Sequence, residues 1–421
     1  MTMQHKYLHF INYLDFYRWD VKAYAFQQKA FENAVRLRDI LKPYNVPLSR
    51  EEMLDNKWSI IAKINFSGKL FLRDPEETKT FKGNVHKVDG ETLIYSKINV
   101  RHGCVYYHPK GAIPFGVSSE YPAYKINQER VNGDFLVLLL QSQYFKDALS
   151  AGTSGISKAR VKPSVFLDIQ IPLPSLEEQN KIVTAYNATI AQADNLSQQA
   201  GDINDQIETY LKDALGMENS SPQKHASGKI YFMHSSQITR WDVWNVVSSN
   251  YSGKYPLTSL QNIIKMQSGK FLPSKEQKGG EYNVYGGNGL TGTHNKFCFS
   301  GKRIVIGRVG EYCGNVHLIE GNYWITDNAL KVDKTTEDVT WEYLTIALKT
   351  LNINQYRSIS AQPSISQTKI LQLQIPVPPL AIQNEIVEHI SALRAEQKNL
   401  QQQASDLRTQ ASQQFEQTIF N

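Results

Sequence analysis

The sequence lacks the features that mark membrane and secreted proteins. Its nearest approach to a membrane span, FLVLLL at residues 135–140, is far shorter than the roughly 20 apolar residues that such a helix needs. The N-terminus has no basic start, apolar stretch and small-residue cleavage site of a signal peptide. We therefore expect a soluble, cytoplasmic protein with no membrane partner.

Cysteine is also scarce. The chain has only Cys104, Cys298 and Cys313, and none of them is in a CxxC pair. Three cysteines cannot all pair with one another, so neither a disulfide framework nor a zinc cluster is expected. We predict that this chain has no metal site.

Recognisable catalytic patterns are missing as well. The sequence has no GxxxxGK[ST] phosphate loop, no [DNS]PP[YFW] tetrapeptide of amino-methyltransferases and no Ser/His/Asp arrangement. The glycine-rich stretch at 285–294 lacks a dinucleotide-binding context and is expected to be a mobile turn. Asp55, Glu77 and Lys79 imitate a nuclease D…ExK spacing, but so short a pattern arises by chance in most chains. We predict no catalytic site.

Two domains are expected from the length of 421 residues. The formal net charge of +6 is unevenly spread: +7 in residues 1–170, −5 in 171–216, +6 in 217–374 and −2 in 375–421. A polyanion would therefore bind the two long segments and avoid the two short acidic ones.

One stretch of sequence occurs twice. IQIPLPSLEEQNKIV at 169–183 returns as LQIPVPPLAIQNEIV at 373–387, with nine of fifteen positions identical. The prolines end a strand-like piece, so each copy indicates an abrupt exit from a globular domain. Ser175 is suited to cap the helix that follows, and Pro379 to begin its counterpart.

A heptad pattern follows each copy in the same register, which predicts two matching long helices. In the first copy the series is Ile182, Tyr186, Thr189, Ala193, Leu196, Ala200, Ile203, Ile207, Tyr210 and Ala214. In the second it is Ile386, Ile390, Leu393, Gln397, Leu400, Ala404, Leu407, Ala411, Gln414 and Thr418. The seams are rich in alanine and polar residues, so each helix alone would be only marginally stable. We therefore expect the two helices to pack against each other.

The globular halves also resemble each other faintly. RWDVKAY at 18–24 corresponds to RWDVWNV at 240–246, and alternating strand-like patterns recur at 90–107 and 300–319. Helical stretches follow at 134–149 and 341–354.

These repeats together predict an α+β fold with two similar mixed domains, at 1–170 and 217–374. Two long antiparallel coiled-coil helices, in spacers 171–216 and 375–421, would separate them with an approximate two-fold axis. Each helix of roughly 40 residues would rise about 60 Å.

The proline-bracketed exits, the LxxQN-x-IV helix openings and the RWD-led segments resemble the specificity subunit of type I restriction-modification systems. The resemblance spans nearly the whole chain; the usual PLxEQ opening is kept in 174–179, whereas Ile382 replaces its acidic residue in the second copy. It implies two target recognition domains that read an asymmetric, bipartite double-stranded DNA site. It also implies two methyltransferase subunits as partners, joined by motor–nuclease subunits in the restriction complex, with S-adenosylmethionine, ATP and Mg²⁺ on those partners and no cofactor in this chain.

On that interpretation, basic and amide side chains on loops would contact bases and phosphates. The DNA-binding candidates in the first half are Lys97, Arg101, His102, Lys158 and Arg160. Those in the second half are Lys270, Asn288, His294, Arg303, Arg308 and Arg357.

Three other readings remain open. The chain could be the recognition adaptor of a methyltransferase-only or other restriction-related complex. It could be a nuclease that uses Asp55, Glu77 and Lys79, or a purely structural scaffold.

Overall fold

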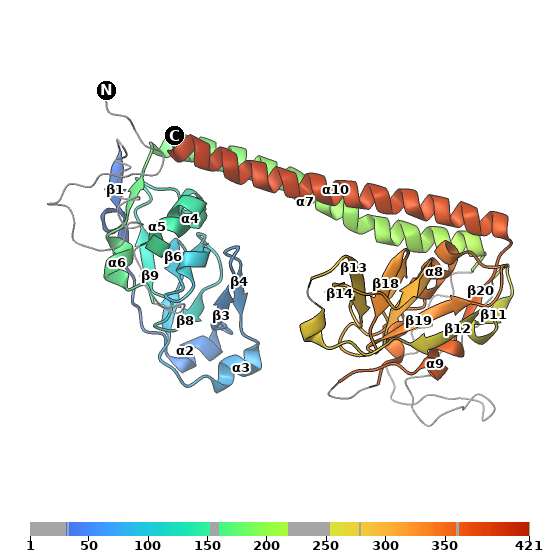
Figure 1. Cartoon of the computed structure of the whole chain (residues 1–421). Helices are drawn as coiled ribbons and strands as arrows, with labels where there is room; N and C mark the ends of the chain where they lie inside the picture. Colours follow the sequence, from blue (N-terminus) through green and yellow to red (C-terminus); the bar gives the residue numbers. More distant parts are fainter. Residues whose placement is uncertain are drawn as a thin grey trace. The chain divides into compact units, whose positions relative to one another are not determined.

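The computed structural model describes residues 31, 33–151, 160–217, 253–277, 279–358 and 362–420. The chain divides into two compact units: Met1–Leu196 with Gln402–Asn421, and Ser197–Gln401. The division falls inside both long helices, so each unit contains part of each helix (Figure 1). No described helix is long and apolar enough to cross a membrane.

The first unit is built on an antiparallel sheet with strand order β2-β9-β6-β7. The strands are β2 (Leu41–Pro43), β6 (Thr92–Tyr95), β7 (Val105–His108) and β9 (Ala123–Ile126). Successive residues of β6 point to opposite faces of the sheet. Leu93 and Tyr95 therefore pack with helical residues such as Phe135, whereas Ile94 packs in a second cluster with Val88 and Phe115.

Helices and short strand pairs surround this sheet. The helical elements are η2 (Leu37–Asp39), α2 (Arg50–Asp55), α3 (Pro75–Thr80), η3 (Val100–His102), α4 (Gly133–Gln141), α5 (Gln143–Ala151) and α6 (Pro163–Leu167). The paired strands are β1 (Ala34–Arg36) with β10 (Gln170–Pro172), β3 (Ile61–Ile64) with β4 (Leu70–Leu72), and β5 (His86–Val88) with β8 (Phe115–Val117).

The second unit has two four-stranded sheets, β12-β19-β16-β17 and β14-β13-β18-β15. The strands are β12 (Ile264–Ser268), β13 (Tyr282–Gly286), β14 (Gly289–His294), β15 (Phe299–Ser300), β16 (Arg303–Gly307), β17 (Val316–Ile319), β18 (Asn322–Ile325) and β19 (Ala329–Lys334). Strands β13 and β18 are parallel, and the other pairs in these two sheets are antiparallel.

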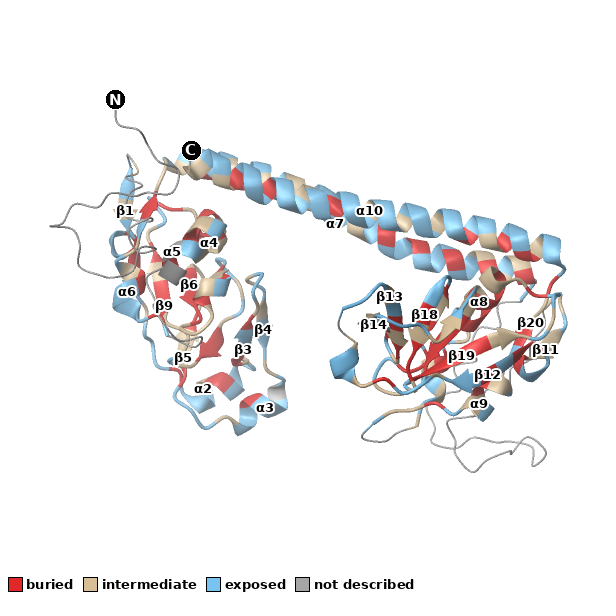
Figure 2. Cartoon of the chain, viewed as in Figure 1, coloured by how far each residue is buried: buried red, intermediate tan, exposed pale blue. Residues whose placement is uncertain are grey.

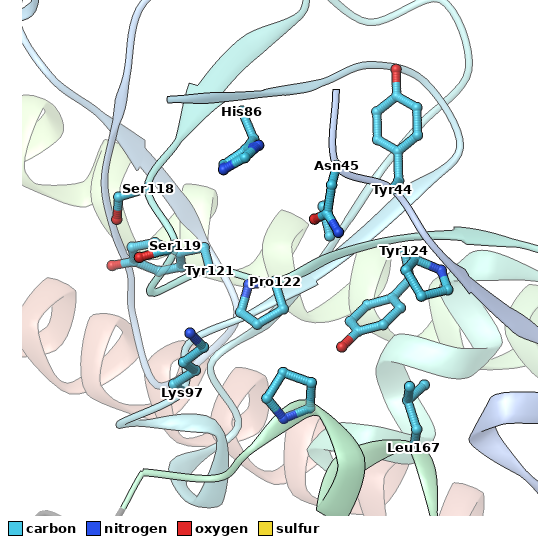
Figure 3. Close-up of a pocket in the computed structure, with 13 residues that line it drawn as sticks. Tyr44, Asn45, His86, Lys97, Ser118, Ser119, Tyr121, Pro122, Tyr124 and Leu167 are labelled. Atoms are coloured by element: carbon cyan, nitrogen blue, oxygen red, sulfur yellow. The ribbon is translucent and has the colours of Figure 1, made fainter. Parts of the chain in front are cut away.

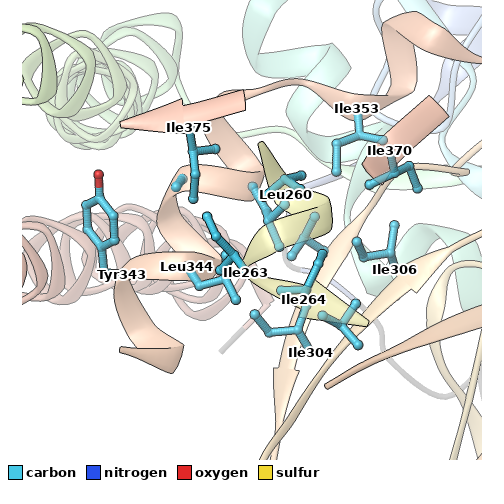
Figure 4. Packing of buried hydrophobic residues seen from close by; sticks show 14 of the residues in the cluster. Leu260, Ile263, Ile264, Ile304, Ile306, Tyr343, Leu344, Ile353, Ile370 and Ile375 are labelled. Carbon is cyan, nitrogen blue, oxygen red and sulfur yellow. The ribbon is translucent and has the colours of Figure 1, made fainter. Parts of the chain in front are cut away.

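The helical elements of this unit are η6 (Leu260–Asn262), η7 (Ser274–Glu276), α8 (Trp341–Thr350), η8 (Ile353–Tyr356) and α9 (Gln367–Leu371). Strand β11 (Leu257–Ser259) pairs with β20 (Gln374–Pro376). The main core lies between the first sheet and α8, where isoleucines such as Ile264, Ile304 and Ile306 pack against Leu344 (Figure 4).

The two units share one internal plan. Each pairs its first strand with the QIP strand that precedes a long helix, and each has a four-stranded antiparallel sheet in the same order. The expected hairpins at 90–107 and 300–319 are present as β6–β7 and β16–β17. The RWD segments at 18–24 and 240–246 lie outside the described residues.

The helical stretch expected at 134–149 is broken in the structure. Ser142 is extended, with φ −60° and ψ 155°, and separates α4 from α5. Its hydroxyl donates to Leu139 O at 2.7 Å and accepts from Phe145 N–H at 3.2 Å. The serine thus ends α4 and caps α5. Its local hydrogen bonds compete with a continuous helix, and the apolar pattern alone does not predict this.

The two long helices, α7 (Leu176–Leu215) and α10 (Leu380–Phe420), pair antiparallel. In the second unit Gln397 Nε2 donates to Ala200 O at 2.7 Å, and the ring centroids of His389 and Tyr210 are 3.9 Å apart. Residue numbers thus rise along one helix as they fall along the other. The fold is therefore the expected α+β class, with two similar domains and antiparallel long helices.

The predicted helix seam is correct except near the end of α10. Every member of the first series is buried or half-buried, and so are the first eight members of the second (Figure 2). Gln414 and Thr418 are exposed instead, and Phe415 is buried. The burial of the large aromatic ring shifts the seam by one residue in this last part.

Ser175 caps α7 as expected, through a reciprocal capping box. Its hydroxyl accepts from Glu178 N–H at 3.3 Å, and Glu178 Oε2 accepts from Ser175 N–H at 2.9 Å. In the second copy Pro379 directly precedes Leu380, the first helical residue.

A fully buried glutamine ties each long helix to its domain. Gln179 Oε1 accepts from Asn132 N–H at 2.9 Å, and its Nε2 donates to Arg130 O at 3.0 Å and Pro174 O at 2.8 Å. Asn132 is the N-cap of α4. One amide side chain thus joins the start of α7 to the start of a domain helix.

The second unit repeats this arrangement. Gln383 Oε1 accepts from the N–H of Thr340, the N-cap of α8, at 2.9 Å. Its Nε2 donates to Asp338 O at 2.7 Å and Pro378 O at 2.8 Å. Both glutamines are 0% exposed. We call these two sets of hydrogen bonds the glutamine clamps.

We predict that Gln383→Met lowers the free energy of unfolding by about 3 kcal/mol, because it removes three hydrogen bonds made by a fully buried amide and leaves their backbone partners unpaired. Urea denaturation of the full chain measures this. Asn384→Ala, at the exposed neighbouring position, is the control and should change stability by less than about 0.5 kcal/mol. Equal stability of Gln383→Met and the unaltered chain would show that the clamp does not hold the domain.

Candidate functional site

The first unit brings Lys97 and Arg160 together at Glu120. Lys97 N–H donates to Glu120 O at 3.1 Å, and Val161 N–H donates to Lys97 O at 2.8 Å. Arg160 Nε lies 3.2 Å from Glu120 Oε2, with 62% of the arginine side chain exposed. Residues distant in sequence thus form one basic edge. Lys158 lies outside the described residues.

Lys97 also borders a cavity of about 490 Å³ (Figure 3). The cavity has flat rings and short polar groups on its walls, and no carboxylate among its described lining residues. Its lining includes Tyr44, Asn45, His86, Ser118, Ser119, Tyr121 and Tyr124. Polar and aromatic groups around a single lysine suit a planar, anionic ligand such as part of a nucleic acid.

The wall of this cavity is held by an ion pair. Tyr44 Oη donates to Asp89 Oδ2 at 2.7 Å, and Lys125 forms an ion pair with the same carboxylate. Burial, together with the hydrogen bond to Asp89, raises the pKa of Tyr44 to about 12. Burial alone would raise the pKa of Asp89, but the hydrogen bonds from Lys125 and Tyr44 hold it below its usual value. Tyr44 therefore stays a neutral donor at neutral pH.

Arg101 and His102 belong to η3, between β6 and β7. Arg101 is half-buried and His102 is exposed. The His102 ring lies 5.1 Å from the ring of Phe66, in the β3–β4 turn. The structure therefore adds the β3–β4 hairpin to the candidate surface. No charge or amide pattern in the sequence indicated Phe66.

In the second unit Trp324 connects Lys270 with His294. Trp324 Nε1 donates to Lys270 O at 3.0 Å, and the ring centroids of His294 and Trp324 are 5.4 Å apart, edge to face. His294 Nδ1 is also 2.9 Å from Glu276 O. Trp324 was not a candidate from the sequence, and the structure places it in β18.

Arg308 and Asn288 lie on loops that approach each other closely. Arg308 Nη1 donates to Ser268 Oγ at 3.0 Å, and Asn315 Nδ2 donates to Asn288 Oδ1 at 3.4 Å. A Cβ atom on Gly307 would be only 2.1 Å from Gly287 O, so the close approach requires glycine there. The stretch at 285–294, expected to be a turn, forms the end of β13, a short turn and the whole of β14.

Arg357 reaches the same loop from the other side. Its Nη1 donates to Glu311 O at 3.5 Å, and Asn354 Nδ2 donates to Cys313 O at 2.7 Å. The backbone of Arg308 is bound to this region as well, because Ile365 N–H donates to Arg308 O at 2.9 Å. The loops after β12, β13 and β16 thus present Lys270, Asn288 and Arg308, and the segment after η8 presents Arg357.

Arg303 is not part of this group. It begins β16, whereas Arg308 follows the other end of that strand. Its Nε lies 2.6 Å from Asp333 Oδ1, and its guanidinium lies 5.9 Å from the centre of the Trp341 ring. These contacts fit a packing role beside α8.

Two of the three nuclease candidates, Glu77 and Lys79, already have other partners. Lys79 Nζ lies 2.6 Å from Glu76 Oε1, and Glu77 Oε2 is 4.0 Å from Arg73 Nη1. Asp55 ends α2, whereas Glu77 and Lys79 lie in α3. Across the described ranges no three His, Cys, Asp or Glu side chains are grouped to hold a metal ion. Cys104, Cys298 and Cys313 are free thiols.

The sequence model of the family described as "Type I restriction modification DNA specificity domain" matches residues 61–208 and 254–406. The specificity subunit of the type I restriction enzyme EcoprrI from Escherichia coli is 31% identical over 126 residues, which cover 28% of this chain and 31% of that protein. The EcoKI specificity subunit from E. coli strain K12 is 22% identical over 294 residues, 65% of this chain and 61% of that one. The matches thus span about a third and about three fifths of these relatives.

A solved chain has the same fold. It comes from a structure described as "complex assembly and conformational transition of the type I R-M system" and aligns with a TM-score of 0.56. The alignment covers 91% of this chain and 95% of that one, at 15% sequence identity.

We predict that Arg303→Ala lowers the free energy of unfolding by about 1 kcal/mol, because it removes a partly buried ion pair and a ring contact. Arg308→Ala, the matched control on the exposed side, should change stability by less than about 0.5 kcal/mol. Urea denaturation of the two variants distinguishes the roles. A larger loss for Arg308→Ala would contradict the assignment of Arg303 to packing.

Proposed function

The chain belongs to the family of the type I restriction modification DNA specificity domain, and on this premise we propose that it selects the DNA site of a type I restriction-modification complex. The supporting observation is the repetition of the glutamine clamp at Gln179 and Gln383. The repeated clamp holds two domains whose surface loops differ. A shared frame with unlike loops fits a protein that reads two different half-sites.

The domains 1–170 and 217–374 would each read one half-site, and the base pairs between the half-sites would remain unread. In the first domain Lys97 and Arg160 would contact DNA at their common edge, with Arg101 and His102 beside them. Lys158 remains a candidate from sequence alone.

In the second domain Lys270, Asn288, His294, Arg308 and Arg357 would contact bases and phosphates. Arginine donates two parallel hydrogen bonds to guanine, and asparagine binds adenine in the same manner. The exposed Arg308 and Asn288 fit such contacts. Arg303 would affect recognition only by stabilising the fold of the domain.

The chain itself would catalyse nothing. Two methyltransferase subunits would bind the spacers 171–216 and 375–421, whose net negative charge suits protein contacts better than DNA contacts. S-adenosylmethionine would be bound by those subunits, and ATP and Mg²⁺ by motor–nuclease subunits. The complex would act in the cytoplasm.

Methylated bases in cells that express this chain with its methyltransferase should define an asymmetric DNA motif in two parts. Two unlike readers held by one chain require two unlike half-sites. Methylome sequencing measures the motif, and cells that express the methyltransferase alone are the control. Methylation within a contiguous palindrome would contradict the proposal.

Arg308→Ala should relax the sequence requirement in only one of the two half-sites. Loss of a bidentate base contact costs about 1–3 kcal/mol of discrimination at that position. The measurement is binding of the assembled complex to duplexes that carry single base-pair changes. Arg303→Ala is the control and should keep the original preference at every position. Relaxation in both halves would argue against one reader per half-site.

A further inference from the structure

The β3–β4 hairpin of the first unit is labelled in Figure 1, and its turn carries an exposed aromatic residue. Phe66 lies in the turn and is 65% exposed. Single exposed apolar residues are common on protein surfaces, so exposure alone assigns no role. Phe66 differs from such residues because its turn is rigid and lysines lie on the same hairpin.

The turn that carries Phe66 is held rigidly. Asn65 Oδ1 accepts from Ser67 N–H at 3.1 Å, Ser67 Oγ at 2.9 Å and Lys69 N–H at 2.7 Å. The main chain closes the same turn, because Asn65 N–H donates to Lys69 O and Gly68 N–H donates to Asn65 O. A ring on such a turn loses little conformational freedom when it binds.

The turn also has support from η3. A Cβ atom on Gly103 would lie 3.1 Å from Phe66 O, so the two backbones are close together. His102 lies against the Phe66 ring at 5.1 Å. The hairpin tip is therefore fixed to the segment that carries the DNA-binding candidates Arg101 and His102.

Two lysines lie on this hairpin, each three residues from Phe66 in the chain. Lys63 Nζ and Lys69 Nζ lie 5.3 and 5.8 Å from the centre of the Phe71 ring. Both lysines are exposed, and in the described part of the chain neither has an ion-pair partner. A rigid apolar tip with two exposed ammonium groups on the same hairpin suits a duplex, in which stacked bases lie beside rows of phosphates.

We propose that the β3–β4 hairpin is a DNA wedge: the Phe66 ring enters between two base pairs of the first domain's half-site, and Lys63 and Lys69 contact the flanking phosphates. Apolar side chains inserted in this way unstack a base step and bend the duplex. The inference rests on the proposed function. It adds a contact whose binding free energy depends on how easily the DNA sequence deforms.

A protein partner is the competing occupant of this surface. Phe71 and Leu72 of β4 are also exposed, at 38% and 45%, but a protein interface has charged residues depleted at its centre. Here two exposed lysines, Lys63 and Lys69, lie on the same hairpin as the exposed ring. The charge therefore favours DNA, and the experiment includes the protein alternative as an outcome.

The test uses the chain assembled with its methyltransferase subunits and a duplex that carries the motif found by methylome sequencing. Permanganate reactivity of thymines reports unstacking, and fluorescence anisotropy reports affinity. The unaltered complex should increase thymine reactivity at one step of one half-site. Phe66→Ala should remove that increase and weaken binding about tenfold or more, whereas Phe66→Trp should retain both.

Ile113→Ala is the matched control, since Ile113 is 77% exposed on a different loop. It should change neither reactivity nor affinity. Lys63→Gln combined with Lys69→Gln should reduce the slope of log affinity against log salt by about 2. This reduction would identify the lysines as phosphate contacts.

If Phe66→Ala leaves thymine reactivity and DNA affinity unchanged while the unaltered complex is still selective, only the wedge proposal is overturned. Loss of methyltransferase binding by Phe66→Ala without DNA present would overturn it in favour of protein docking. An unaltered complex that shows no sequence preference would refute the proposed function, and the wedge with it.

Discussion

A buried amide side chain determines where each long helix begins relative to its domain. Gln179 and Gln383 each join three backbone groups, and two of these belong to the domain while the third precedes the helix. Glutamine suits this position because one planar group both accepts and donates. The arrangement is costly to alter, since any apolar replacement removes all three hydrogen bonds and leaves their backbone partners unpaired.

The two domains share their frame and differ in their surface elements. Both units retain the strand pair before the long helix, the sheet order and the clamp. Around this frame the first unit has the β3–β4 hairpin and η3, whereas the second has a second four-stranded sheet and its β13–β14 hairpin. Two recognition surfaces can therefore differ without a change in how either domain is attached.

Predictions from the sequence were accurate where a single hydrophobic period determines the structure. They were less accurate where several side-chain interactions compete. The heptad series located nearly the whole seam of α7 and α10, but Phe415 displaced Gln414 from it. Ser142 divided a helix that its apolar residues indicated as continuous. Among the candidate residues, charge and residue type could not separate Arg303, which pairs with Asp333, from the exposed Arg308.

The duplication, the two long helices and the α+β class were determined by the sequence itself, because local periodicity and repeated motifs are properties of the chain. The Lys97–Glu120–Arg160 edge, the partner of each clamp glutamine and the exposure of Phe66 were decided only by the tertiary structure. Each of these depends on residues far apart in the chain. Their distances follow from how sheets and loops pack, which residue order alone does not specify.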